Sequence, residues 1–369
     1  MPYLIDKIEV SPSSGNYDIL IGSNWLQDSA SALASKILMD NVLIITNPVV
    51  GDLYAESLIK GLRQIGCSHI IRHDIPDGEH SKNINEYNRA QEALALNFPD
   101  PASVPVVIAL GGGVVGDISG FVAGTFRRGI TCIQVPTTLL ACVDSSVGGK
   151  TGINFANIKN LLGVFHQPQM VVIDLATLHT LEKRQLCSGM AEVVKYGVVC
   201  NRQLFEFVEA HTEALLDIDP NAMAKVVGDC CRIKASVVRE DERDTGGRRI
   251  VLNFGHTLGH AIESASDYRL LHGEAIAIGM LAATDLAIAL NLCDKEVKLR
   301  IEKLLRKLQL PVEINGRDLQ IESIMKTMRH DKKFSSGENK FVLPTKLGTW
   351  QTAQGIAESL IHKILSAYL

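Results

Sequence analysis

The apolar and polar positions of the first 180 residues follow a pattern that alternates strands with helices. Two alternating segments, Tyr3–Val10 and Tyr17–Ile21, are joined by Ser-Pro-Ser-Ser-Gly-Asn, which predicts a hairpin. The pattern then predicts strands at residues 42–46, 70–75, 104–110, 131–135 and 170–174, and helices at residues 24–39, 49–65 and from 114 onward. Such alternation is typical of a mostly parallel sheet with right-handed crossovers.

Beyond Leu181 the period of the apolar positions changes from two to about 3.6 and stays there. Helices are predicted at residues 183–199, 222–240, 256–264, 273–290 and 294–310, the last ending at Pro311. We therefore expect an α/β domain at residues 1–180 and an all-α domain at residues 181–369. Two domains also agree with the length, because 369 residues exceed what one core usually organises.

Composition narrows the class of protein. Hydrophobic residues make up 46% and charged residues 21%, which is typical of a soluble globular protein. The net charge of −4 favours neither nucleic acid nor an anionic membrane as a partner, and the most apolar segment, residues 275–283, is too short to span a bilayer. The eight cysteines contain no C-x-x-C pair and follow no secretory leader. A cytoplasmic protein with reduced cysteines is expected.

The predicted strand at residues 104–110 ends in the three glycines 111–113. Glycines let the backbone approach a ligand closely, and the N-terminus of the following helix points its free N–H groups at the same place, so the turn predicts an anion site. Gly111, Gly113 and Gly116 satisfy G-x-G-x-x-G, but the acidic residue expected about 20 positions later is missing. A tight strand-to-helix turn without a ligand would explain the glycines equally well.

Polar residues cluster around this turn in the sequence, beside glycines or at predicted strand ends, where open α/β sheets bind ligands. They are Asp117, Arg128, Thr137, Thr138, Asp144, Lys150, Lys159 and Asn160. A second charged segment, Asp77-Gly78-Glu79-His80-Ser81-Lys82, lies at another strand-to-helix junction, where a turn with Ser81 as the helix cap is also an adequate explanation.

The helical half contains a carboxylate and three histidines at spacings that suit a metal. Glu192 and Lys195 are three apart, His256 and His260 are four apart, and His272 opens the next predicted helix. One carboxylate with two imidazoles is a zinc-like set that leaves positions open for a substrate. Thr257 replaces the glutamate of H-E-x-x-H, which argues against a metalloprotease. Taken singly, a helix ion pair and buried histidines would explain these residues.

Three long motifs, GGGVVGD, PTTLLA-x-VDSS-x-GGKT and KNL-x-G, resemble the 3-dehydroquinate synthase family of the sugar phosphate cyclases. The resemblance implies a Rossmann-like α/β domain followed by an all-α domain. It also implies a carbon–oxygen lyase of the shikimate pathway, which supplies aromatic amino acid and chorismate biosynthesis. The implied substrate is 3-deoxy-D-arabino-heptulosonate 7-phosphate, converted to 3-dehydroquinate and phosphate by transient oxidation with NAD⁺, phosphate elimination, re-reduction and aldol cyclisation.

Matching the family's motifs residue by residue implies a role for each candidate. Glu192, His256 and His272 would bind one Zn²⁺ or Co²⁺. NAD would contact Asp77, Gly78, Glu79, His80, Ser81, Lys82, Gly113, Val114, Val115, Gly116, Asp117, Thr137, Thr138, Lys150, Lys159, Thr177, Leu178, His179 and Thr180. Catalysis and substrate binding would involve Asp144, Lys150, Asn160, Lys195, Lys234, Arg249, Asn253, His260, Lys332 and Lys333, with the choice between the last two left open. Arg128 would reach the neighbouring active site of a homodimer.

Other functions are compatible with parts of this pattern. Sister cyclases that make deoxy-inosose or valiolone skeletons depart from the family in the VDSS-x-GGKT region, and this chain does not. A metal-dependent alcohol dehydrogenase of the glycerol dehydrogenase type would release NADH. An NAD-binding scaffold without activity would have lost the metal or lysine positions, which are all present here.

Overall fold

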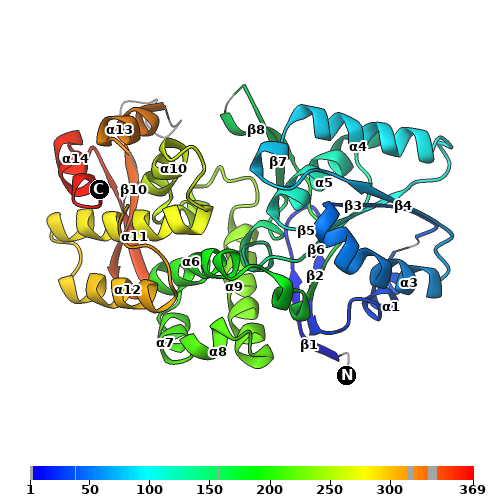
Figure 1. Ribbon diagram of the computed structural model, residues 1–369, viewed down its shortest axis with the longest axis horizontal. Helices are drawn as coiled ribbons and strands as arrows, with labels where there is room; N and C mark the ends of the chain where they lie inside the picture. Colours follow the sequence, from blue (N-terminus) through cyan, green and yellow to red (C-terminus); the bar gives the residue numbers. More distant parts are fainter. Residues whose placement is uncertain (1–2, 38, 157, 315–318, 331–338) are drawn as a thin grey trace. The chain divides into compact units, whose positions relative to one another are not determined.

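The computed structural model describes residues 3–37, 39–156, 158–314, 319–330 and 339–369 (Figure 1). It divides into two compact units. The first comprises Met1–Leu181 and Met223–Arg243, and the second comprises Glu182–Ala222 and Asp244–Leu369. The sequence pattern, with its boundary at residue 180, did not predict that the chain returns to the first unit through most of α9 (Pro220–Glu240).

The first unit is built on a seven-stranded sheet in the order β1-β2-β9-β6-β5-β3-β4. β1 pairs antiparallel with β2, and every other neighbouring pair is parallel, which confirms the expected mostly parallel sheet. The strands are β1 (Tyr3–Val10), β2 (Tyr17–Ser23), β3 (Asn41–Thr46), β4 (His69–Asp74), β5 (Val106–Gly111), β6 (Cys132–Pro136) and β9 (Met170–Asp174).

Both faces of this sheet are covered, which explains why its strands are nearly continuous apolar runs. Successive residues of β3 point to opposite faces: Val42 and Ile44 join one buried cluster with Leu58 of α3, and Leu43 and Ile45 join another with residues of α4 and α5. The helical segments of the unit are α1 (Ser29–Ala34), α2 (Pro48–Val50), η1 (Gly51–Ala55), α3 (Glu56–Gln64), η2 (Glu79–Ser81), α4 (Ile84–Asn97), α5 (Gly113–Thr125), η3 (Phe126–Arg128), η4 (Ala141–Ser145) and η5 (Leu175–Thr180).

The helix predicted at residues 24–39 is wrong in its extent, because α1 covers only Ser29–Ala34. The buried carboxylate of Asp174, at the end of β9, accepts the backbone N–H groups of Asn24, Trp25 and Leu26 at 2.8–2.9 Å. Asn24 also has φ of 54°. The chain is therefore held in a turn around Asp174, and a long-range acceptor of this kind leaves no periodic signal in the sequence.

A hairpin that the sequence pattern did not predict, β7 (Lys150–Phe155) with β8 (Ile158–Phe165), forms a separate two-stranded sheet. Its side chains pack on α5: a Cβ at Gly120 would lie 2.3 Å from Thr151, and one at Gly124 would lie 2.6 Å from Val164. Phe155, Ile158 and Phe165 keep 44–48% of their surface exposed. Because many residues of β7 and β8 are exposed or half-buried, the sequence of the hairpin lacks the continuous apolar run of a buried strand.

The returning segment, residues 223–243, is joined to the first unit by polar contacts. Lys234 donates to the backbone oxygen and the carboxylate of Asp144 at 2.7 and 2.8 Å. Cys231 Sγ lies 3.3 Å from the carbonyl oxygen of Cys142. Glu242 accepts hydrogen bonds from Ser13 and Ser14 in the β1–β2 loop.

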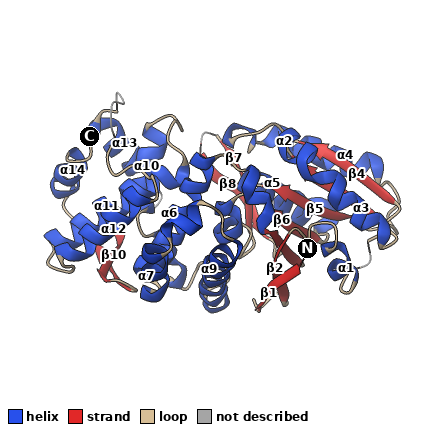
Figure 2. Ribbon diagram, turned by 60° about the horizontal axis from the view of Figure 1, so that its bottom comes forward, coloured by secondary structure: helices blue, strands red, loops and turns tan. Residues whose placement is uncertain are grey.

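The second unit is mostly helical, as expected (Figure 2). Its described elements are α6 (Lys183–Val199), α7 (Arg202–Ala210), α8 (Thr212–Leu216), η6 (Arg248–Asn253), α10 (His256–Ala265), α11 (His272–Ala289), α12 (Lys295–Lys307), α13 (Ile321–His330), β10 (Lys340–Lys346), β11 (Thr349–Gln354) and α14 (Glu358–Ser366). The β10–β11 hairpin is an addition to the expected all-α domain. Among the described helices, α11 is long and apolar enough to cross a membrane, but 78% of it is buried, as in the core helix of a folded domain.

We predict that Asp174→Ala destabilises the protein by about 2–4 kcal/mol, because buried backbone N–H groups would lose a charged acceptor. Urea unfolding followed by circular dichroism measures the change. Asp174→Asn is the control, since its remaining oxygen still accepts and the loss should be smaller. Equal stability of Asp174→Ala and the native chain would contradict this explanation of the turn.

Candidate active site

In the first unit, the N-terminus of α5 at the carboxyl end of β5 is suited to an anion. Gly112 is the N-cap, no side chain caps the helix, and no acidic residue lies in its first turn. The first N–H groups of a helix need partners, and a phosphate provides them together with a charge that suits the helix dipole. The glycines also have packing roles: a Cβ at Gly116 would lie 2.7 Å from Gln134, and one at Gly111 would lie 2.7 Å from Val115.

The loops after the neighbouring parallel strands end at the same edge of the sheet. Thr137 follows β6 and bonds through its N–H to Gly111, while its buried hydroxyl has no hydrogen-bond partner among the described residues. Thr138 is adjacent, and its hydroxyl accepts the N–H of Ala141. Residues 177–180 follow β9, where Thr177 and Leu178 are buried and His179 and Thr180 are exposed.

The segment Asp77–Lys82 follows β4, and two asparagines that the sequence reasoning missed connect it to its surroundings. Asn47, after β3, donates to Asp77 at 2.9 Å. Asn154, in β7, donates to Glu79 at 2.9 Å, and its side-chain oxygen accepts the backbone N–H of Asn160, whose φ is 52°. Asparagines are common in loops, so no spacing in the sequence distinguishes these two.

Lys82 is the centre of a buried polar cluster. Its side chain is only 6% exposed, and Nζ lies 2.5 Å from a carboxylate oxygen of Asp117 and 2.5 Å from the amide oxygen of Asn160. Burial raises the pKa of the Asp117 carboxyl, and the Lys82 ammonium opposes that shift. The cluster therefore joins two residues expected at the nucleotide with one expected at the substrate.

The other candidates of the first unit lie in several elements. Asp144, in η4, is paired with Lys234 of α9. Lys150 is exposed at the start of β7, directly after Gly148 and Gly149, which both have positive φ. Lys159 is half-buried in β8, and Arg128 is exposed in η3.

In the second unit, α6, α10 and α11 approach one another so closely that glycine is required at their contacts. A Cβ at Gly273 would lie 1.8 Å from the backbone oxygen of Ser188, and one at Gly279 would lie 2.2 Å from the backbone oxygen of Gly255. Real Cβ contacts are never this short, so any side chain would force the helices apart. The close approach places Glu192 of α6, His256 of α10 and His272 of α11 together.

The carboxylate of Glu192 lies between two imidazoles. Its Oε1 is 3.6 Å from Nε2 of His256 and 3.6 Å from Nε2 of His272. Two ligands about 2.0–2.2 Å from one tetrahedral Zn²⁺ stand about 3.4 Å apart, so these separations fit a shared ion. Both Glu192 oxygens are buried and receive no hydrogen bond from the described residues, although Lys195 forms an ion pair with Oε2.

His260 extends this cluster, since the ligand atoms of His256, His260 and His272 lie within 4.8 Å of one another. The ring nitrogen Nδ1 of His256 lies 3.0 Å from the carbonyl oxygen of Phe254. A carbonyl only accepts, so Nδ1 carries the proton and Nε2 presents its lone pair towards Glu192.

Burial and neighbouring charges shift the pKa values of the three clustered residues in different directions. Burial and the charge of Lys195 lower the pKa of His256 to about 3, so its imidazole is neutral near pH 7. Burial raises the pKa of Glu192, but the positive charge of Lys195 outweighs this effect, and the pKa of Glu192 lies well below its usual value. Burial lowers the pKa of His272, but Glu192 and Glu263 outweigh that effect and raise it to about 9. His272 is therefore protonated near pH 7 in the metal-free chain, with the carboxylates of Glu192 and Glu263 on opposite sides of its ring, and a metal that binds Nε2 must displace that proton.

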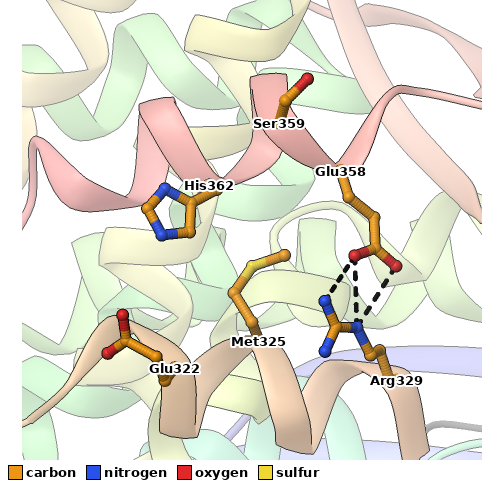
Figure 3. Close-up of a pocket in the computed structure, with 6 residues that line it drawn as sticks. All are labelled: Glu322, Met325, Arg329, Glu358, Ser359 and His362. Atoms are coloured by element: carbon orange, nitrogen blue, oxygen red, sulfur yellow. Dashed lines mark hydrogen bonds and ion pairs between the residues drawn. The ribbon is translucent and has the colours of Figure 1, made fainter.

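Two other candidates of this unit lie in η6, where Arg249 is buried and Asn253 is half-buried. Lys332 and Lys333 lie outside the described residues. A hollow of about 270 Å³ is lined by Glu322, Met325 and Arg329 of α13 and by Glu358, Ser359 and His362 of α14, whose side chains are drawn in Figure 3. None of the candidate residues that the structure describes lines this hollow, so the candidate site is assigned to the polar clusters instead.

Family models match most of the chain. The model described as 3-dehydroquinate synthase N-terminal matches residues 72–188, and the model described as 3-dehydroquinate synthase C-terminal matches residues 189–334. A curated relative, the 3-dehydroquinate synthase of Desulforamulus reducens, is 44% identical over 360 residues, which are 97% of this chain and 99% of the relative. This chain belongs to the 3-dehydroquinate synthase family.

Solved structures of sister cyclases resemble this family member in fold. The 2-epi-5-epi-valiolone synthase of Streptomyces hygroscopicus subsp. jinggangensis, with NAD⁺ and Zn²⁺ bound, is 28% identical with a TM-score of 0.85 over 95% of this chain and 96% of its own. A 2-deoxy-scyllo-inosose synthase complexed with carbaglucose-6-phosphate, NAD⁺ and Co²⁺ is 26% identical with a TM-score of 0.88 over 99% of this chain and 100% of its own. The resemblance to the 3-dehydroquinate synthase family expected from the motifs is confirmed, and so is the fold class.

We predict that Gly279→Ala destabilises the protein by about 1–3 kcal/mol, because the added methyl group would meet the backbone of α10. Thermal and urea unfolding measure the loss. The control is Ala289→Gly at the exposed end of α11, for which helix propensity alone predicts at most about 1 kcal/mol. A neutral or stabilising effect of Gly279→Ala would contradict the close packing described for these helices.

Proposed function

We propose that this chain converts 3-deoxy-D-arabino-heptulosonate 7-phosphate to 3-dehydroquinate and phosphate, as a phosphate-eliminating cyclase of the shikimate pathway. The observation that carries the proposal is the Glu192, His256 and His272 cluster in a chain that matches 3-dehydroquinate synthases over nearly its whole length. The full-length identity of 44% to such a synthase, against 26–28% to the sister cyclases, favours this reaction over theirs.

NAD and one divalent metal, Zn²⁺ or Co²⁺, are the proposed cofactors. Among the described residues, no side chain caps α5 and the hydroxyl of Thr137 has no hydrogen-bond partner. These two features and the Asp77–Lys82 segment fit a dinucleotide, while Glu192, His256 and His272 fit the ion. When bound, NAD⁺ supplies reversible oxidation of the substrate's C5 alcohol, and the metal polarises the oxygen at that carbon. Nucleotide binding is thus assigned to the first unit and metal binding to the second.

The chain's own residues supply charge and proton transfer for the elimination. Lys195 is 1% exposed and held against Glu192, so its ammonium is fixed where negative charge develops. His260, beside the two ligand histidines, is placed to exchange protons with substrate hydroxyls. Asn253 and Arg249 add directed hydrogen bonds and a cation in the same unit.

In the first unit, cations and amides are held in place for the substrate by partners of their own. Asp144 fixes the Lys234 ammonium at 2.8 Å, and Lys82 fixes the amide of Asn160 at 2.5 Å. Lys150 follows two glycines with positive φ, which suits close approach to a phosphate. Fixing these groups before the reaction lowers the reorganisation needed as the phosphate leaves.

A homodimer in which Arg128 completes the neighbouring phosphate site is part of the proposal. Arg128 is exposed at the C-terminal end of α5, where its backbone has a φ of 66°. Phe165 of β8 is also exposed. It lies near the same end of α5, because the ring of the next residue, His166, is 2.8 Å from the backbone oxygen of Ile130. An exposed arginine next to exposed apolar side chains is typical of a subunit interface.

Phosphate release with catalytic NAD⁺ tests the proposed reaction. We expect a turnover of about 1–10³ s⁻¹ with the heptulosonate phosphate and no accumulation of free NADH. The second substrate is an analogue in which a phosphonate, attached through carbon on a chain one bond longer, replaces the phosphate. Because this group cannot be eliminated, bound NADH should rise to at most one equivalent per site and then stay constant. Absorbance of the reduced nicotinamide measures free NADH in the first experiment and bound NADH in the second. Steady release of free NADH would instead identify a dehydrogenase.

Mixed dimers test the role of Arg128. We predict that Arg128→Ala and Lys150→Ala each lower turnover about 100-fold, and that co-expression of the two variants restores about a quarter of native activity. In a mixed dimer one site would combine an intact Lys150 with an intact Arg128 from its neighbour.

Co-purification of the two variants through different affinity tags is the control for subunit exchange. If the subunits exchange and the mixed sample still recovers no activity, Arg128 acts in its own subunit's site or in no site.

A further inference from the structure

Glu263 is a buried acidic residue that neither the motifs nor the proposed function assigns. It lies on α10 seven residues after His256 and three after His260, so the three side chains share one face of the helix. Its side chain is 7% exposed. A buried carboxylate on the face that carries a histidine cluster calls for a partner, because an uncompensated buried charge is strongly destabilising.

One partner of Glu263 is the imidazole of His272, the first residue of α11. Glu263 Oε2 lies 3.7 Å from Nδ1 of His272, while Nε2 on the opposite side of the ring lies 3.6 Å from Glu192. His272 is thus placed between two carboxylates that belong to different helices. The Nδ1 contact is longer than a hydrogen bond, and a small rotation of the ring or the carboxylate would convert it into one.

The two proposed ligand histidines differ in what they meet at Nδ1. His256 meets the backbone carbonyl of Phe254, two residues before it, so its ring is oriented by its own local chain. His272 begins its helix after Leu271, and the acceptor that approaches its Nδ1 in the described part of the structure comes from the side chain of Glu263. A carboxylate at this position fixes the ring and makes it a stronger electron donor than a carbonyl does.

We propose that Glu263 is a positioning residue that holds His272 with Nε2 directed at the metal position. The inference rests on the proposed metal-dependent function. It assigns Glu263 no contact with the substrate. Its effect passes through His272, so it should appear first in metal affinity and in the electronic environment of the bound ion.

Metal binding by the otherwise intact protein tests this. Metal-free native chain and the variants Glu263→Ala and Glu263→Gln are titrated with Co²⁺ and Zn²⁺ against a chromophoric chelator. We expect Glu263→Ala to bind about 10–100-fold more weakly. Glu263→Gln keeps an acceptor oxygen, so it should bind more tightly than Glu263→Ala but with a shifted visible Co²⁺ spectrum.

A matched control distinguishes the proposed positioning role of Glu263 from a purely structural role. Asp285, on α11, is a carboxylate bonded to Lys298 and Tyr368 away from the histidines. Asp285→Asn should lower the thermal stability of the metal-free protein and leave metal affinity unchanged. If Glu263→Ala binds Co²⁺ like the native chain, or if both variants lose affinity in proportion to stability, the proposal is overturned.

Failure of the proposed function would look different. A native chain that binds neither metal would overturn the metal-dependent reaction together with this inference. A native chain that binds metal, beside a Glu263→Ala variant of equal affinity, would overturn only the role of Glu263. Should Glu263→Ala fail to fold, the comparison of Glu263→Gln with the native chain decides, since an unchanged Co²⁺ spectrum there contradicts the proposal.

Discussion

The cluster of Glu192, His256 and His272 depends on how closely three helix backbones approach one another. Glu192 and Lys195 are 0% and 1% exposed, and withdrawing such a pair from water carries a large desolvation penalty unless further groups compensate it. The compensation comes from side chains on α10 and α11, which reach Glu192 only because Gly273 and Gly279 present no side chain at the contacts. The identity of two glycines therefore determines whether a carboxylate and two imidazoles can share one ion.

In the first unit, hydrogen bonds between side chains hold the candidate residues in place. Several residues expected at the nucleotide lie on the loops that follow the parallel strands, and loops need partners to hold a single geometry. Lys82 supplies one such partner by joining Asp117 with Asn160, and Asn154 supplies another by joining Glu79 with the backbone of Asn160. These bonds couple the segment expected at the nucleotide to the hairpin expected at the substrate, within one unit.

Much of this could be predicted from the sequence, for reasons that differ between residues. The strands of the sheet were visible because burial on both faces makes them continuous apolar runs, and His256 with His260 were visible through helical spacing. Glu263, Asn47 and Asn154 were not, because each is a single polar residue whose partner lies in another element. The turn at Asn24 was missed for the same reason, since Asp174 lies 150 residues away. The β7–β8 hairpin was missed because its residues are only partly buried.

The return of residues 223–243 to the first unit affects how this unit folds during synthesis on the ribosome. Lys234, Cys231 and Glu242 each contact residues of the first unit that are 75 or more positions earlier in the sequence. A ribosome must therefore add the whole intervening segment, Glu182–Ala222, before the first unit can close. At a synthesis rate of roughly 5–20 residues per second, this segment alone takes about two to eight seconds to make, and the first unit still lacks α9 throughout that time. During that interval the nascent chain exposes the residues of the first unit that α9 later contacts, among them Cys142 and Asp144.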